Sequence, residues 1–205
     1  MEHVHMWERV LDIFFPPSKE ALLVRTFSEE VLISLYAQRH IDGVSVLSTY
    51  KDVRIRALIH EAKFKNNTRA QKLLSVLVAR FLEESAHTID SIVPIPLSRA
   101  RMRARGYNQV YEVLKNVTRS PSIEVNTRVL VRTRDTQPQT ELKRSERLVN
   151  VQNAFEVPQK YASRITGKHV LIVDDVMTTG ATLRVAKAAL LPHSPASVTC
   201  VALAH

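Results

Sequence analysis

A short run near the C-terminal end of the chain carries most of the residues that could do chemistry. An apolar stretch, residues 170–173, leads into two adjacent carboxylates, Asp174 and Asp175, and then into a turn rich in hydroxyl groups. The turn and the start of the helix after it contain Thr178, Thr179, Gly180, Ala181 and Thr182. Backbone N–H groups at a helix N-terminus, together with threonine hydroxyls, suit a phosphate. Adjacent side chains at a strand end point in different directions, so the two acids need not share a role.

An ordinary helix N-cap is the alternative explanation for this run. It accounts for one threonine and one aspartate near the positive end of a helix. It does not account for two acids, three threonines and a glycine together after an apolar strand. We therefore predict a phosphate-binding loop in which Gly180 allows a close approach of the backbone or a positive φ. The acids suit sugar hydroxyls or Mg²⁺-bound water.

A second segment is strongly basic. Residues 99–147 contain 12 Lys and Arg against 5 Asp and Glu, a net charge of +7, whereas the rest of the chain has 17 against 15. Such a block favours anionic partners, either phosphate-bearing small molecules or nucleic acid, unless it is simply a solvated basic loop. Its arginines include Arg99, Arg101, Arg103 and Arg105. In an extended loop all four could project to one side, and in a helix they would spread around it. Pro94 and Pro96 favour loop geometry at the start.

The hydrophobic pattern predicts the elements that position these residues. Apolar residues at helical spacing indicate helices at residues 20–36, 53–64, 70–81, 108–117 and 181–191. Short apolar, β-branched runs indicate strands at residues 91–95, 128–132, 169–173 and 197–202. Their alternation predicts an α/β fold with a mainly parallel sheet flanked by helices and a small N-terminal helical segment. Ligands of such sheets bind beyond the carboxyl ends of the strands, where the loop at residues 174–180 lies.

Residues 170–182 resemble the signature by which type I phosphoribosyltransferases bind phosphoribosyl pyrophosphate (PRPP). The resemblance implies that Asp174 and Asp175 contact the ribose hydroxyls. It also implies that the 5′-phosphate is held by Thr178, Thr179, Gly180, Ala181 and Thr182, and that Mg²⁺ binds with PRPP. The signature indicates a type I phosphoribosyltransferase-like fold and not a particular reaction.

Further motifs are similar to the ComF (ComFC/GntX) branch of that superfamily. They lie at residues 50–65, 93–109, 132–150 and 153–155. The resemblance covers about residues 50–205, so we expect an N-terminal segment at 1–49 and a phosphoribosyltransferase-like domain at 50–205. ComF proteins usually carry a four-cysteine zinc module after a Phe-Pro-Pro-like segment. This chain keeps residues 14–17 of that segment but has one cysteine, Cys200, which we expect to be buried. Because His3, His5 and His40 lack the spacing of metal ligands, we expect no zinc site.

The resemblance also implies roles for the basic segment. The loop that contains Arg99, Arg101, Arg103 and Arg105 would receive the pyrophosphate, which an arginine fork can bind through two hydrogen bonds. Four arginines exceed what one pyrophosphate needs, so the surplus could follow a nucleic-acid backbone. Tyr107 and Tyr111 could stack on a base or pack in the core. Residues 132–147 resemble the segment that closes over the substrate, or form a solvated loop. The expected lid contacts are Gln137, Gln139, Lys143 and Arg147.

These features predict a PRPP-binding, ComF-like protein that handles single-stranded DNA during natural transformation, with a competence helicase as a candidate partner. The alternatives are a nucleobase phosphoribosyltransferase of salvage metabolism and a non-catalytic PRPP-sensing regulator. No general base stands out in the sequence, so catalysis is left open. The 205 residues are 45% hydrophobic, enough for one core, and no stretch reaches the roughly 20 apolar residues of a membrane span. We expect a cytoplasmic protein without membrane insertion.

Overall fold

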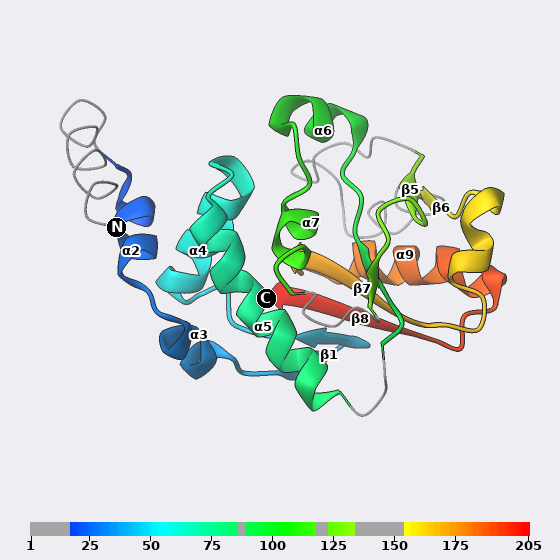
Figure 1. Ribbon diagram of the computed structural model, residues 1–205, viewed down its shortest axis with the longest axis horizontal. Helices are drawn as coiled ribbons and strands as arrows, with labels where there is room; N and C mark the ends of the chain where they lie inside the picture. The colour runs from blue at the N-terminus through cyan, green and yellow to red at the C-terminus, as the bar shows by residue number, and fades with distance from the viewer. Residues whose placement is uncertain (1–16, 86–88, 118–122, 134–153) are drawn as a thin grey trace.

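The chain folds around a six-stranded sheet in the order β1-β2-β8-β7-β3-β4 (Figure 1). The computed structural model describes residues 17–85, 89–117, 123–133 and 154–205. The strands are β1 (Arg39–Ile41), β2 (Val44–Val46), β3 (Ser91–Pro94), β4 (Glu124–Val125), β7 (His169–Val176) and β8 (Ser197–Ala204). Only the β1–β2 pair is antiparallel among these neighbours. The mainly parallel α/β sheet predicted from the sequence is confirmed.

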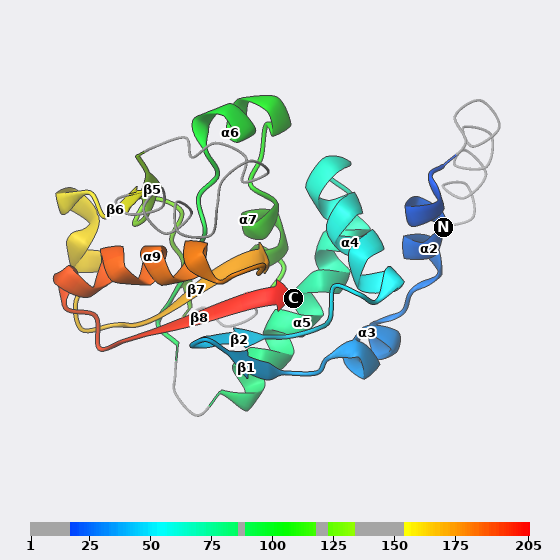
Figure 2. The same cartoon turned by 180° about the vertical axis from the view of Figure 1, so that it is seen from behind.

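Helices cover both faces of this sheet. They are α2 (Lys19–Thr26), α3 (Glu29–Leu35), α4 (Val53–Phe64), α5 (Thr68–Glu84), α6 (Arg99–Arg105), α7 (Gln109–Leu114) and α9 (Ala181–Leu190). Figures 1 and 2 show α9 on one face, with α5 and α7 on the other. A separate two-stranded pair joins β5 (Val131–Arg132) to β6 (Phe155–Glu156).

Residues 170–173 of the central strand β7 are all apolar because this part of the strand is covered on both faces. Val170 and Ile172 belong to the hydrophobic cluster under α9, together with Cys200, which is 3% exposed. Leu171 and Val173 belong to the cluster formed with α4, α5 and α7. Successive side chains of a strand point to opposite faces, so the run fills two cores at once. The expected burial of Cys200 is confirmed.

The ends of several strands differ from those predicted, most of all for β7 and β5. β7 continues to Val176, so Asp174 and Asp175 lie on the strand and not in a loop. The pairing with β8 explains this, because Asp174 aligns with Ala202 and Val176 with Ala204. The strand predicted at residues 128–132 is limited to β5, although Val129 and Leu130 are buried. Their apolar character therefore reflects packing and not strand pairing.

A buried carboxylate of α4 holds the start of α2 and the start of α5. Glu61 is 2% exposed and accepts hydrogen bonds from Ser18 Oγ (3.3 Å) and Asn67 Nδ2 (3.0 Å). Ser18 is the N-cap of α2, and Asn67 is the N-cap of α5. One side chain of α4 therefore connects the starts of two other helices. β1 and β2 also lie before residue 50, and β2 pairs with β8 of the main sheet.

We expect Glu61→Ala to lower the free energy of unfolding by about 1–3 kcal/mol, since it removes two hydrogen bonds that a buried carboxylate accepts from half-buried partners. Urea denaturation followed by circular dichroism measures the change. The matched control is Glu83→Ala on α5, which removes an exposed carboxylate 3.6 Å from Arg80 and should change stability by about 0.5 kcal/mol or less. Equal effects of the two substitutions would contradict the role assigned to Glu61.

Candidate functional site

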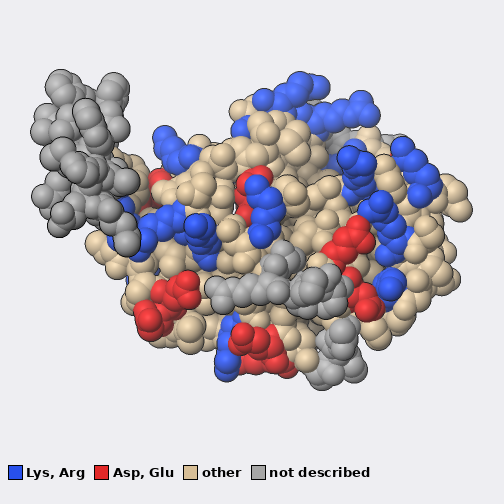
Figure 3. Space-filling view, in the orientation of Figure 1, with Lys and Arg blue, Asp and Glu red and all other residues tan. Residues whose placement is uncertain are grey.

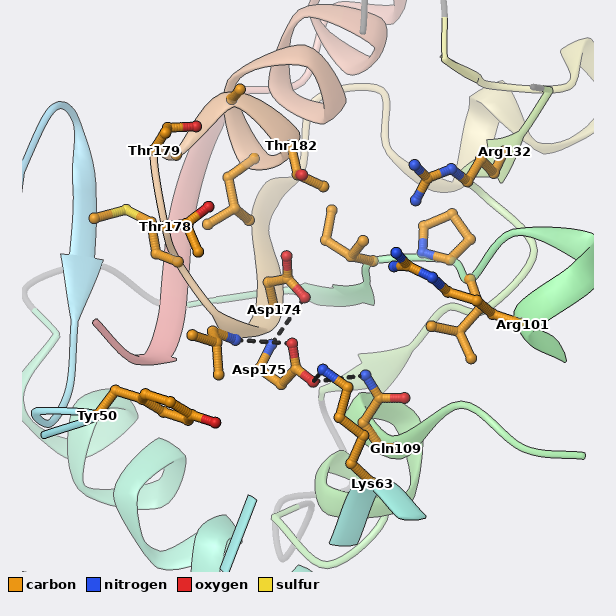
Figure 4. A pocket seen from close by; sticks show the side chains of 18 of the residues that line it. Tyr50, Lys63, Arg101, Gln109, Arg132, Asp174, Asp175, Thr178, Thr179 and Thr182 are labelled. Atoms are coloured by element: carbon orange, nitrogen blue, oxygen red, sulfur yellow. Dashed lines mark hydrogen bonds and ion pairs between the residues drawn. The ribbon is translucent and has the colours of Figure 1, made fainter. Parts of the chain in front are cut away.

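A cavity of about 440 Å³ opens at the carboxyl ends of β3 and β7 (Figure 4). Its walls come from α4, from the loop after β3, from α6 and α7, and from the chain that links β7 to α9. Asp174, Asp175 and residues 178–182 all line it. The sequence placed a ligand site at this edge of the sheet, and the cavity lies there.

The turn between β7 and α9 forms one wall of the cavity. Gly180 has φ 68° and ψ 0° and is the N-cap of α9, so a positive φ is required at this position. A Cβ at residue 180 would lie only 2.9 Å from Nη1 of Arg184. The buried Met177 fixes the turn to β8, because its N–H donates to the carbonyl of Ala204 (2.9 Å). The hydroxyl side chains of the turn are thus held beside the free N–H groups of the α9 N-terminus.

Asp175 is the anchored member of the acidic pair. It is 7% exposed, and its Oδ2 lies 3.0 Å from Nζ of Lys63 and accepts a 2.8 Å hydrogen bond from Nε2 of Gln109. Its Oδ1 accepts from the N–H of Val176 (2.8 Å). Burial opposes ionisation, but the positive charge and hydrogen bonds of Lys63, with the bond from Gln109, hold the pKa of Asp175 below its usual value.

Asp174 is the half-buried member of the pair, and it lines the cavity. Figure 4 shows its carboxylate between the threonine turn and Arg101, and its Oδ1 accepts a hydrogen bond from the N–H of Asp175 (2.9 Å). Burial and the neighbouring charge of Asp175 raise the pKa of Asp174 to about 7. The two acids therefore have different environments: one is fixed in the protein, and the other is available to a ligand.

The four candidate arginines are divided between two surfaces. The loop expected after Pro94 extends to Ser98, and Arg99–Arg105 then form α6, which begins with the Ser98 cap and ends at Gly106 with φ 81°. Residues four apart share a helix face, so Arg101 and Arg105 line the cavity. Arg99 and Arg103 lie on another face and do not line it. The structure therefore does not bring the four arginines together.

Four lining residues with polar groups were not predicted as site residues: Tyr50, Lys63, Gln109 and Arg132. Lys63 and Gln109 lie far from Asp175 in the sequence, and no spacing rule relates them to it. Arg105 extends their network, because it donates a hydrogen bond to Oε1 of Gln109. Its Cζ also lies over the Phe64 ring, 5.4 Å from the ring centre. The motifs at residues 50–65, 93–109 and 132–150 were the only signal that these positions matter.

Several predicted residues cannot be placed in this site. Gln137, Gln139, Lys143 and Arg147, and also His3 and His5, lie outside the described residues. His40 is exposed on β1. Across residues 17–85, 89–117, 123–133 and 154–205, no group of three His, Cys, Asp or Glu side chains is placed to hold a metal ion. In the same ranges no helix is long and apolar enough to span a membrane.

Comparison with known proteins agrees with this geometry. Residues 104–205 match the phosphoribosyl transferase domain, which includes β7, the threonine turn, α9 and β8. The chain is 32% identical over 148 residues to the DNA utilization protein YhgH of Escherichia coli strain K12, covering 69% of this chain and 63% of that protein. It is 30% identical over 131 residues to competence protein F of Haemophilus influenzae, covering 62% and 57% of the two chains. It is 33% identical over 109 residues to competence protein ComFC of Bacillus subtilis, covering 52% and 40%.

The sheet, the acidic strand end and the threonine turn define a type I phosphoribosyltransferase-like domain. Its similarity to the two competence proteins and to YhgH shows that the chain belongs to the ComF family. The chain spans about three fifths of the length of the YhgH proteins that it matches.

Removing the cation beside Asp175 should raise the pKa of that carboxyl, because burial then opposes its ionisation without the charge of Lys63. We expect this from Lys63→Met, measured by NMR titration of the aspartate carboxyl carbons. The pKa of Asp175 is depressed, so the stability contributed by the ion pair is present at neutral pH and is lost as the pH falls through that pKa. Lys65→Met, at the exposed C-cap of α4, removes the same charge and should leave the Asp175 titration unchanged. A titration unaltered in both variants would show that Lys63 does not control Asp175.

Proposed function

We propose that the cavity binds PRPP together with Mg²⁺. The observation that carries this proposal is the order of chemical groups across the cavity: the threonine turn, then Asp174, then Arg101 and Arg132 on the opposite wall (Figure 4). PRPP presents a matching order of a 5′-phosphate, a ribose and a pyrophosphate. The spacing of the groups along one cavity supports a ligand that is anionic at both ends and polar in the middle.

Each wall suits one part of that ligand. Residues 178–182 offer hydroxyls and helix N-terminal N–H groups to the 5′-phosphate. Asp174 faces the cavity, where it would accept hydrogen bonds from the ribose hydroxyls. Asp175 is held by Lys63 and Gln109 and keeps the strand end in position. Arg101 and Arg105 can each donate paired hydrogen bonds to phosphate oxygens.

The residues present also fit Mg²⁺. This ion prefers carboxylate, phosphate and water oxygens, and it usually binds through one or two carboxylates with substrate phosphates. Asp174 supplies a carboxylate that faces the cavity. When bound, Mg²⁺ would neutralise charge on the pyrophosphate, and the chain itself would orient the ribose between the turn and the arginines. Zinc is not part of this proposal, in agreement with the expectation from the cysteine content.

The wider role that we propose is the handling of single-stranded DNA during DNA uptake in the cytoplasm, in response to PRPP. The names of the relatives support this role: competence protein F, competence protein ComFC and a DNA utilization protein. The basic surface around α6 provides the charge that a strand needs. A competence helicase is the proposed partner that would pass a strand to this protein.

We expect Asp174→Asn to weaken PRPP binding in Mg²⁺ by about 1.5–3 kcal/mol, the range for a hydrogen bond that involves a charged group. Replacing Arg101 and Arg105 together by Ala should weaken it at least as much, because both line the cavity. Isothermal titration calorimetry measures both effects. The matched control replaces Arg99 and Arg103 by Ala, which removes the same charge from the other face of α6. Unchanged affinity in Asp174→Asn and in the Arg101/Arg105 variant would refute the site.

A product assay separates this role from nucleobase salvage. The protein is incubated with PRPP, Mg²⁺ and each nucleobase in turn, and nucleotide formation is followed by chromatography. Transfer to a base would need no protein nucleophile, only positioning of the base and stabilisation of the departing pyrophosphate. We expect PRPP to be returned unchanged with every base. Accumulation of a nucleotide would identify a salvage enzyme on the same site.

A further inference from the structure

A second cavity, of about 660 Å³, lies beside α6 on the face that carries Arg99 and Arg103. Tyr107 and Tyr111 line it together with Met102 of α6 and with Pro94 and Pro96. We call it the tyrosine groove. We call the cavity proposed to bind PRPP the phosphate cavity. Pro96 and Leu97 line both this cavity and the tyrosine groove, so the same loop separates the two. The proposed PRPP site uses none of the arginine or tyrosine side chains of the tyrosine groove.

The rim of the tyrosine groove carries uncompensated positive charge. Arg99 and Arg103 are exposed, and neither forms an ion pair with a described residue. The acid that lines the groove, Glu112, is paired with Lys115 at 2.6 Å. Figure 3 shows basic side chains gathered over the part of the molecule where Figure 1 places α6. The groove therefore favours an anionic occupant.

The aromatic wall of the groove is fixed in place. The hydroxyl of Tyr107 donates to the carbonyl of Ala62 (3.1 Å) and accepts from the N–H of Asn66 (2.9 Å), so this ring is tied to α4 and the turn after it. Tyr111 is half-buried on α7, and Nζ of Lys115 lies 5.4 Å from the centre of its ring. Rings that are already ordered lose little conformational entropy when a planar group stacks on them.

We propose that the tyrosine groove binds single-stranded nucleic acid, with backbone phosphates at Arg99 and Arg103 and bases against Tyr107 and Tyr111. A basic rim beside aromatic rings is the combination that binds single strands without sequence preference, because every base has a face that can stack. The choice of DNA as the strand rests on the proposed function, and the location of the strand does not. Because Arg101 and Arg105 face the other cavity, the strand and PRPP occupy adjoining but separate sites.

The decisive experiment compares two double variants of α6 that lose the same charge. Arg99 and Arg103 are replaced by Ala in one, and Arg101 and Arg105 in the other. The probe is a labelled oligothymidylate about 15 nucleotides long, within the span of known single-strand sites, and anisotropy is followed over a range of salt concentrations. Each phosphate contact contributes about −0.7 to the log–log salt slope. We expect the Arg99/Arg103 variant to flatten the slope by about 1.4 and the Arg101/Arg105 variant to leave it nearly unchanged.

The stacking contribution is tested at Tyr111. Tyr111→Leu keeps an apolar side chain of similar size but removes the ring, and we expect affinity for the oligothymidylate to fall about fivefold or more. Tyr111→Phe keeps the ring and should bind like the unaltered protein. Thermal melting of each variant checks the fold. If Tyr111→Leu does not fold, the exposed arginine variants still decide the location of the strand.

Simultaneous binding separates this proposal from the PRPP proposal. We expect saturating PRPP with Mg²⁺ to leave the oligothymidylate bound, and the Arg99/Arg103 variant to keep its PRPP affinity. Two outcomes would place the strand in the phosphate cavity and contradict its proposed location in the tyrosine groove. One is displacement of the strand by PRPP, and the other is loss of strand binding only in the Arg101/Arg105 variant. Equal affinity of Tyr111→Leu and Tyr111→Phe for the oligothymidylate would show that bases do not stack on Tyr111, and this would also contradict the proposal. Strand binding at the groove without any PRPP binding would refute the proposed function and support the groove.

Discussion

The site depends on how the protein accommodates the charge of Asp175 at the end of its central strand. A buried carboxylate is costly unless it is paired and hydrogen-bonded, and breaking such a pair leaves a charge without compensation. Lys63 of α4 and Gln109 of α7 both contact the same carboxylate oxygen. This one group therefore joins two helices to β7. Arg105 bonds to Gln109, so the position of α6 follows from the same contact.

The anchoring of Asp175 also explains why two neighbouring acids can differ. Successive residues of a strand point in opposite directions, so the Asp174 carboxylate faces the cavity while that of Asp175 faces the helices. Burial and repulsion by Asp175 raise the pKa of Asp174, whereas the contacts with Lys63 and Gln109 lower that of Asp175. A pair whose pKa values move apart in this way has one member suited to structure and one suited to a ligand.

The helix α6 turns one basic segment into two surfaces. Its Ser98 cap and its left-handed Gly106 end confine it to seven residues, which is enough to place arginines on two faces. One face contributes to a polar cavity beside the acids, and the other contributes to a groove with aromatic walls. The loop of Pro96 and Leu97 is shared by both. A small anion and an extended strand could thus be bound next to each other without competing for the same side chains.

The sequence alone determined the parts of this protein that depend on local pattern. The apolar run before Asp174, the threonine turn and the glycine that must adopt a positive φ predicted β7, the turn and α9, because strand burial, turn geometry and helix capping are written in adjacent residues. Only the tertiary structure decided which distant residues meet there. The ladder with β8 extended β7 through both acids, and packing of α4 and α7 brought Lys63 and Gln109 to Asp175. The alternating arginines are compatible with a loop or a helix in the sequence. The caps of α6 make the segment a helix, and its position beside the cavity puts the arginines on two different surfaces.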